Sequence, residues 1–160
     1  MWQDFANVLN DLNKDYKALI ELGKKKRNAL VMVDMKTVEN LLPTEEKLTA
    51  DIARLEKKRQ SILLKLASTS EKLGPESKMD DILQLAPAGK LREIMQKLYA
   101  MLQATVQEAQ ELSEGNALLI RAAMEAAAFH LNRIGGATVE PAYGRGGEVV
   151  THRKNLDYNA

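Results

Sequence analysis

The sequence predicts an all-α protein: an antiparallel three-helix coiled-coil bundle with long helices, a short helical segment between the second and third, and a flexible C-terminal tail. Apolar residues in the middle of the chain recur in alternating steps of four and three, which is the spacing of a coiled-coil seam. The seam consists of Leu48, Ile52, Leu55, Ile62, Leu66 and Leu73, with Arg59 and Thr69 in the two slots that lack an apolar residue. The same spacing recurs before and after this stretch.

The first long helix is expected from about Trp2 to Leu41, with a break in its apolar stripe between Gly23 and Arg27. Its stripe consists of Phe5, Leu9, Leu12, Tyr16, Leu19, Leu30 and Val33. The segment 43–46, Pro-Thr-Glu-Glu, is expected to end this helix and to begin the next, with Thr44 as the N-cap. This short connection predicts that the first two helices are antiparallel.

The second helix is expected to end at Gly74-Pro75, before a short segment of one or two helical turns around Met79, Ile82, Leu83 and Leu85. Pro87 suits the first position of the third helix, which then meets no breaker before Gly135-Gly136. The apolar residues of the third helix are Leu91, Ile94, Leu98, Met101, Leu102, Leu112, Leu119, Ala123, Ala126 and Leu131.

The domain organisation follows from a change of composition near residue 135. Residues 1–134 are expected to form a single helical-bundle domain. Residues 135–160 hold five of the nine glycines among few apolar side chains, and we expect a flexible Gly-rich tail there. At about 1.5 Å per residue the three helices span roughly 60, 45 and 70 Å, so the C-terminal end of the third should be left over.

Composition excludes several classes of protein. The formal net charge is +1 and there are no cysteines, so disulfides and thiolate metal sites are ruled out. The first residues carry an early acid and no apolar core, and the longest apolar run, 29–33, is far below the roughly 18 residues of a membrane span. We expect a cytoplasmic protein with no membrane insertion.

Candidate catalytic and metal-binding residues are few. His130 follows Glu125 at a spacing of five, which is not the Glu-x-x-His geometry of di-metal bundles, and His152 lies in the tail. Adjacent carboxylates such as Asp80 and Asp81 point away from each other on a helix. The sequence therefore predicts no enzyme, no catalytic residue, no metal site and no cofactor.

Two basic runs, 24–27 and 57–59, raise the question of nucleic acid. Acidic residues flank both runs and no aromatic residue is interleaved with them to stack on bases. We expect no nucleic-acid binding. Lys26 and Arg59, at seam positions, are expected to extend over the stripe or to pair across it.

The C-terminal part of the third helix differs in kind, because alanines replace the leucines found upstream. Small side chains let another helix approach closely, which favours a groove for the amphipathic helix of a partner. A tightly packed core, or simply a strong helix-forming run, explains the alanines as well.

The chain resembles the FlgN-type flagellar export chaperones over nearly its full length. The resemblance is carried by the segments 25–31 (KKRNALV), 45–48 (EEKL), 55–59 (LEKKR) and 114–119 (EGNALL), with Asp34, Leu41 and Tyr143-Gly144. It implies a cytoplasmic chaperone that holds C-terminal helical segments of hook-filament junction proteins, prevents their premature assembly and delivers them to components of the flagellar type III export apparatus. The run Ala126-Ala127-Ala128 is smaller than the family pattern expects.

On this reading, an amphipathic client helix lies against one face of the third helix and loses its apolar hydration there. The expected partner-binding residues are Asn116, Leu119, Ile120, Ala123, Met124, Ala127, Leu131 and Tyr143. Asn116 is either a polar element that fixes the register or an Asn that faces solvent. A different class of function, a structural coiled-coil or tether protein that self-associates through the same stripes, stays open, as does a homodimer.

Overall fold

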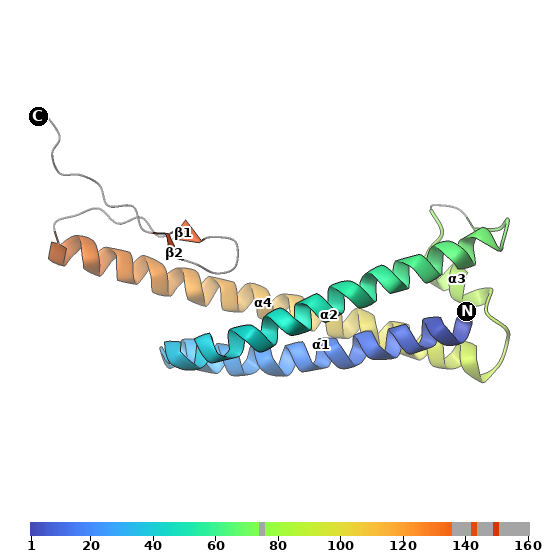
Figure 1. Cartoon of the computed structure of the whole chain (residues 1–160), viewed down its shortest axis with the longest axis horizontal. Helices are drawn as coiled ribbons and strands as arrows, with labels where there is room; N and C mark the ends of the chain where they lie inside the picture. Colours follow the sequence, from blue (N-terminus) through green and yellow to red (C-terminus); the bar gives the residue numbers. More distant parts are fainter. Residues whose placement is uncertain (74–75, 136–141, 144–148, 151–160) are drawn as a thin grey trace, which may run out of the picture. The chain divides into compact units, whose positions relative to one another are not determined.

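The computed structural model describes residues 1–73, 76–135, 142–143 and 149–150 (Figure 1). Its elements are α1 (Trp2–Val31), α2 (Met35–Ser68), α3 (Met79–Gln84), α4 (Lys90–Gly135), β1 (Ala142–Tyr143) and β2 (Val149–Val150). The chain divides into two compact units, Met1–Ser113 and Glu114–Ala160. The predicted all-α class, with three long helices and one short helical segment, is confirmed.

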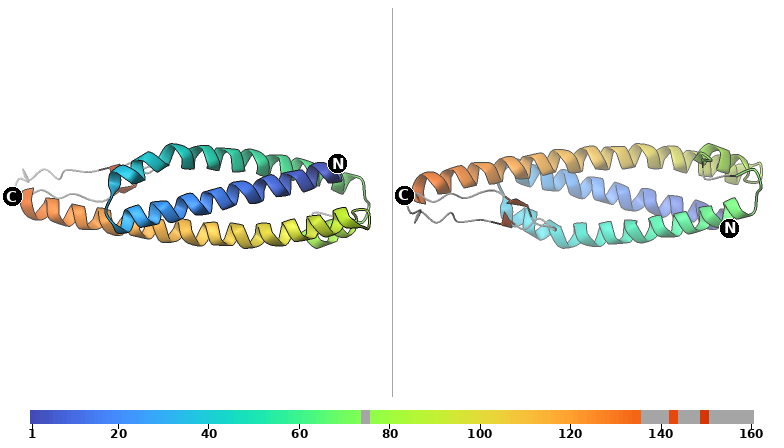
Figure 2. Two further views of the ribbon diagram at one scale, coloured as in Figure 1. Left: turned by 90° about the horizontal axis from the view of Figure 1, so that it is seen from below. Right: turned by 90° about the horizontal axis from the view of Figure 1, so that it is seen from above.

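In the first unit, α1 and α2 run side by side in opposite directions, and the first half of α4 packs against them (Figures 1 and 2). The core lies where the apolar stripes of these helices meet α3. It consists of Phe5, Ala6, Val8, Leu9, Leu12, Ile52, Ile62, Leu66, Leu83, Ala86, Met95 and Leu102. The predicted seam of the second helix therefore faces inward at Ile52, Ile62 and Leu66, and burial of this stripe is the main favourable term in folding.

The turn between α1 and α2 lies earlier than the sequence predicted. After Val31 the Val33 N–H donates to the Leu30 carbonyl at 3.2 Å and the Asp34 N–H to the Ala29 carbonyl at 2.8 Å, the two bonds of a Schellman ending. Val33 has a φ of 55°, a left-handed conformation in which glycine is usual. The prediction that the first helix continues to Leu41 is therefore wrong, since α1 ends at Val31. The sequence did not reveal this end, because the turn contains no glycine.

Asp34, and not Thr44, is the N-cap of α2. Its carboxylate accepts from the Thr37 N–H at 3.2 Å and from the Thr37 hydroxyl at 2.5 Å. These bonds lower the pKa of Asp34, the side-chain bond most. Pro43 lies inside the helix although it lacks an N–H, and the cost is offset by the cap and by packing that includes the buried Val38.

The ends of α2 and α4 also differ from prediction. Helix α2 ends at Ser68, before Gly74-Pro75, where the Ser68 and Thr69 hydroxyls donate to backbone carbonyls of the last turn. Helix α4 begins at Lys90 and not at Pro87, because Gly89 has a φ of +134° and the chain cannot be helical through it. The predicted end of the third helix at Gly135 is confirmed.

The connection from α3 to α4 is held by a side chain of α4. The guanidinium of Arg92 donates from Nε to the carbonyl of Ala86 at 2.9 Å, and its Nη2 donates to the same oxygen. Ala86 is itself buried in the core. The bonds therefore fix the chain between the short helix and the start of α4.

Polar side chains add specific links between the helices of the first unit. Asn13 is buried, and its Nδ2 donates to the carbonyls of Leu9 at 3.0 Å and Leu98 at 2.9 Å. The hydroxyl of Thr105 lies 3.3 Å from Asn13 Oδ1. Lys26 Nζ pairs with Glu45 at 3.1 Å, which joins α1 to α2 and confirms that Lys26 pairs across the seam. These contacts fix which residues of neighbouring helices lie opposite each other.

Candidate partner-binding surface

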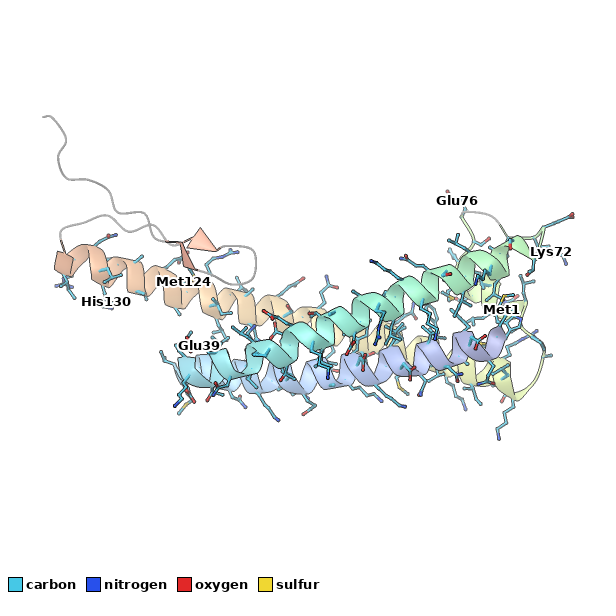
Figure 3. The ribbon with its side chains drawn as sticks, in the orientation of Figure 1. Met1, Glu39, Lys72, Glu76, Met124 and His130 are labelled. Atoms are coloured by element: carbon cyan, nitrogen blue, oxygen red, sulfur yellow. The ribbon has the colours of Figure 1, made fainter. Side chains whose placement is uncertain are left out.

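The second half of α4 carries seven of the eight predicted partner-binding residues, and Met124 and His130 mark this part of the helix in Figure 3. The seven follow one another at spacings that place them on one face of the helix. They are Asn116, Leu119, Ile120, Ala123, Met124, Ala127 and Leu131. The helix brings these residues together because the stretch from Gly115 to Ile134 holds no proline and is rich in alanine and leucine.

Exposure on this face increases toward the C-terminal end of α4. Asn116 is buried, while Leu119, Ile120 and Met124 are half-buried. Ala123, Ala127 and Leu131 are exposed, Leu131 at 53 %. The reading of Asn116 as a residue that faces solvent is therefore wrong, and the accessible apolar surface lies in the last turns.

Three large apolar side chains of this segment were missed by the sequence reasoning. Ile134 is 85 % exposed and continues the predicted face, since it lies three residues after Leu131. Leu118 and Phe129 are 63 % and 60 % exposed and lie on the other side of the helix, eleven residues apart. Periodicity could have found Ile134. Nothing in the sequence distinguishes Leu118 and Phe129 from core residues, because their exposure is set by what the helix packs against.

Tyr143, the eighth predicted residue, lies in β1. Its backbone pairs antiparallel with Val149 of β2, and Ala142 pairs with Val150. This two-stranded pairing was not predicted. The side chain of Tyr143 lies outside the described residues, as does most of the segment 136–160, so both the contact expected of Tyr143 and the flexible tail remain predictions.

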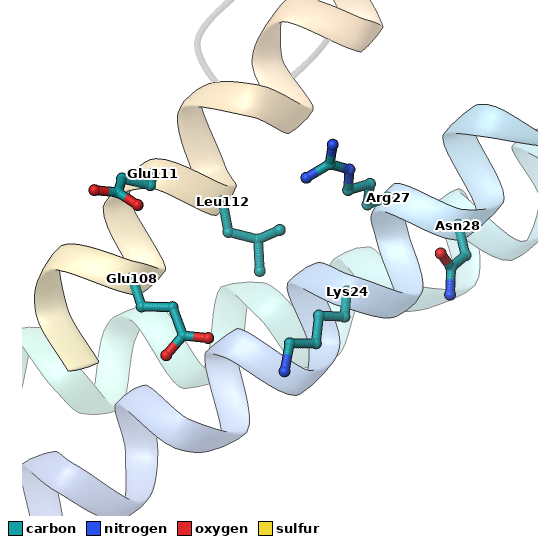
Figure 4. Close-up of a pocket in the computed structure, with 6 residues that line it drawn as sticks. All are labelled: Lys24, Arg27, Asn28, Glu108, Glu111 and Leu112. Carbon is teal, nitrogen blue, oxygen red and sulfur yellow. The ribbon is translucent and has the colours of Figure 1, made fainter. Parts of the chain in front are cut away.

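A separate hollow of about 330 Å³ lies between α1 and α4 within the first unit (Figure 4). It is lined by Lys24, Arg27 and Asn28 of α1 and by Glu108, Glu111 and Leu112 of α4. Lys24 Nζ binds Glu21 of its own helix at 3.2 Å, and Glu111 accepts from Gln107 Nε2 at 3.1 Å. Among the described residues no ion pair joins the two walls, so the hollow separates opposite charges.

The described residues give no positive sign of bound metal or of a bilayer-spanning segment. Within them, no group of three or more His, Cys, Asp or Glu side chains lies close enough together to hold a metal ion. None of the helices described is both long enough and apolar enough to span a membrane.

Comparison with known families identifies the chain. The family model described as FlgN protein matches residues 1–151, nearly the whole sequence. The chain belongs to the FlgN family. No curated protein and no solved structure matches it. The predicted resemblance is thereby confirmed, and membership gives the chain the general role of a flagellar export chaperone in a family that is not one of enzymes.

Proposed function

We propose that this FlgN-family protein is a cytoplasmic chaperone that binds C-terminal helical segments of hook-filament junction proteins. It keeps them from assembling early and delivers them to the type III export apparatus. One observation carries the proposal: a family match over residues 1–151 in a chain whose α4 presents a continuous apolar face with an exposed end. The client's amphipathic helix would lie along this face.

Apolar contact explains why such a client would bind. A segment that becomes buried only in the assembled filament exposes an apolar stripe while it is still a free subunit. Laying that stripe against Ala127, Leu131 and Ile134 removes apolar surface of both chains from water. The small side chains at Ala123 and Ala127 allow the two helices to approach closely. Ordering the client segment consumes a few kcal/mol of the gross contact energy, which suits a client that must be released.

Leu131→Asp tests this site directly. The variant places a charge where the client's apolar stripe would lie, so we expect the affinity for a fluorescent C-terminal fragment of a junction protein to fall at least tenfold, about 1.4 kcal/mol. Binding is measured by fluorescence anisotropy. Because Leu131 is exposed, circular dichroism should stay that of the parent protein.

Ile94→Asp is the matched control. Ile94 is also an exposed aliphatic residue of α4, at 41 %, but it lies in the first unit, far along the helix from the proposed site. This variant should bind the fragment as the parent does. Equal affinity of Leu131→Asp and the parent, or equal loss in both variants, would refute the proposed face.

A further inference from the structure

Gly115 lies in the interior of α4, where none of the described residues around it requires a glycine. A Cβ atom added there would meet no atom of the described residues within 4 Å, and the φ of Gly115 is not in the left-handed region. Glycine in a helix interior destabilises the helix by roughly 0.5–1 kcal/mol relative to alanine. Among the described residues, neither close packing nor backbone geometry therefore explains why position 115 is a glycine. What is left is the effect of glycine on helix stability, which is lower than with alanine.

The helix before Gly115 is held firmly by the first unit. Met95 is fully buried, Leu102 and Ala109 are nearly so, and the Thr105 hydroxyl contacts Asn13 of α1. One turn later, Leu112 is half-buried and borders the charged hollow between α1 and α4 (Figure 4). The boundary between the two compact units then falls between Ser113 and Glu114. Gly115 thus lies two residues after Ser113, the last residue of the first unit, and directly before the buried Asn116.

We infer that the segment 113–115 is a joint in α4, at which the helix bends so that its second half moves independently of the three-helix unit. Sharp bends in helices occur at Gly and Ser positions, and the sequence here is Ser113-Glu114-Gly115. The joint lets the apolar face of residues 119–134 take up different orientations while the core of the first unit stays intact. The inference does not rest on the identity of any client, and it is tested without one.

Spin-label distances measure the joint. The chain has no cysteine, so Lys97→Cys and Glu125→Cys, both at exposed positions of α4, give a clean pair on either side of Gly115. A straight helix at about 1.5 Å per residue places their Cα atoms about 42 Å apart. In the full chain, double electron-electron resonance should give a broad distribution that extends to shorter distances. Gly115→Ala should narrow it around the value for a straight helix.

Two further measurements isolate the cause. Amide hydrogen exchange of residues 113–117 should slow about fivefold in Gly115→Ala, the effect of about 1 kcal/mol on local opening. Adding Ala104→Gly to Gly115→Ala places a glycine where the core holds the helix, and the distribution should stay narrow. A parent distribution as narrow as that of Gly115→Ala, exchange unchanged by the substitution, or broadening by Ala104→Gly would each overturn the joint.

Discussion

Asn13 is a polar residue in an otherwise apolar core, and every polar atom of its side chain has a partner. Its amide nitrogen donates to two carbonyls, one on α1 and one on α4, and its oxygen accepts from Thr105. Thr105 is buried as well, and its hydroxyl lies within hydrogen-bond distance of the Met101 and Leu102 carbonyls. A buried polar group stabilises only when its bonds are made, so this pair selects one register of α1 against α4.

A double-mutant cycle measures this contribution. Asn13→Ala should lower the free energy of unfolding by about 2 kcal/mol, because the bonds from its amide nitrogen to the Leu9 and Leu98 carbonyls are lost and the Thr105 hydroxyl loses one of its three acceptors. Thr105→Val alone should cost about 1 kcal/mol. If the two residues act as one network, the double variant loses less than the sum by about 0.5–1 kcal/mol. Urea unfolding followed by circular dichroism gives the four values, and strict additivity would show that the two side chains are independent.

At the scale of the elements, the start of α2 differs from the start that the sequence pattern predicted, because Asp34 caps the helix ten residues before Thr44. The pattern Pro43-Thr44-Glu45-Glu46 has the composition of a helix start, yet these residues lie inside α2. Glu45 pairs with Lys26 of α1. This ion pair does not distinguish the two possible helix starts, because a helix that began at Thr44 would also allow it. The decisive residues are Asp34, which caps the helix, and Val33, which makes the left-handed turn.

Alanine substitutions at the two candidate caps distinguish the two helix starts. Thr44→Ala should raise the free energy of unfolding slightly, by about 0.5 kcal/mol, because alanine is the better residue in a helix interior. Asp34→Ala should lower the urea midpoint, because the Thr37 N–H loses its acceptor. Loss of stability in Thr44→Ala, with Asp34→Ala unaffected, would place the helix start at Thr44 after all.

The sequence predicted the helices but not all of their ends. The spacing of apolar residues correctly predicted that Ile52, Ile62 and Leu66 are buried, because residues at this spacing share one face of the helix. It missed Met95, which is fully buried, and placed Ile94 on the stripe although Ile94 is exposed. Neighbouring apolar residues on one helix look alike in sequence, and only the position of the packed neighbours decides which of them is covered.

The candidate partner-binding surface, too, could be predicted only in part. The shared face of residues 116–131 follows from helical geometry and could be predicted. The burial of Asn116 and the exposure of Leu118 and Phe129 could not, because they depend on tertiary packing. The turn at Val33 was hidden for another reason: a β-branched residue rarely takes a left-handed conformation, so no sequence rule marks it as the end of a helix.

At the scale of the whole molecule, the hydrophobic core and the proposed client-binding face belong to different units of the chain. The first unit, Met1–Ser113, holds the core in which three helices and α3 meet. In the second unit the helix continues with large apolar side chains in contact with solvent at Leu118, Phe129, Leu131 and Ile134. Exposed apolar side chains also gather at the turn between α1 and α2, at Val31, Met32, Val33 and Met35, so exposure alone does not select the face on α4. The proposal for α4 adds the family match to this exposure.

Titration calorimetry tests the central claim, that this FlgN-family protein binds the C-terminal helical segments of hook-filament junction proteins. The full chain is titrated with such fragments from the same genome at two temperatures. We predict a one-to-one complex with a Kd of about 1 μM or tighter, and a negative heat-capacity change from the burial of apolar surface. Absence of heat with every fragment at both temperatures would contradict the claim, and a self-associating coiled-coil tether would then become the better account.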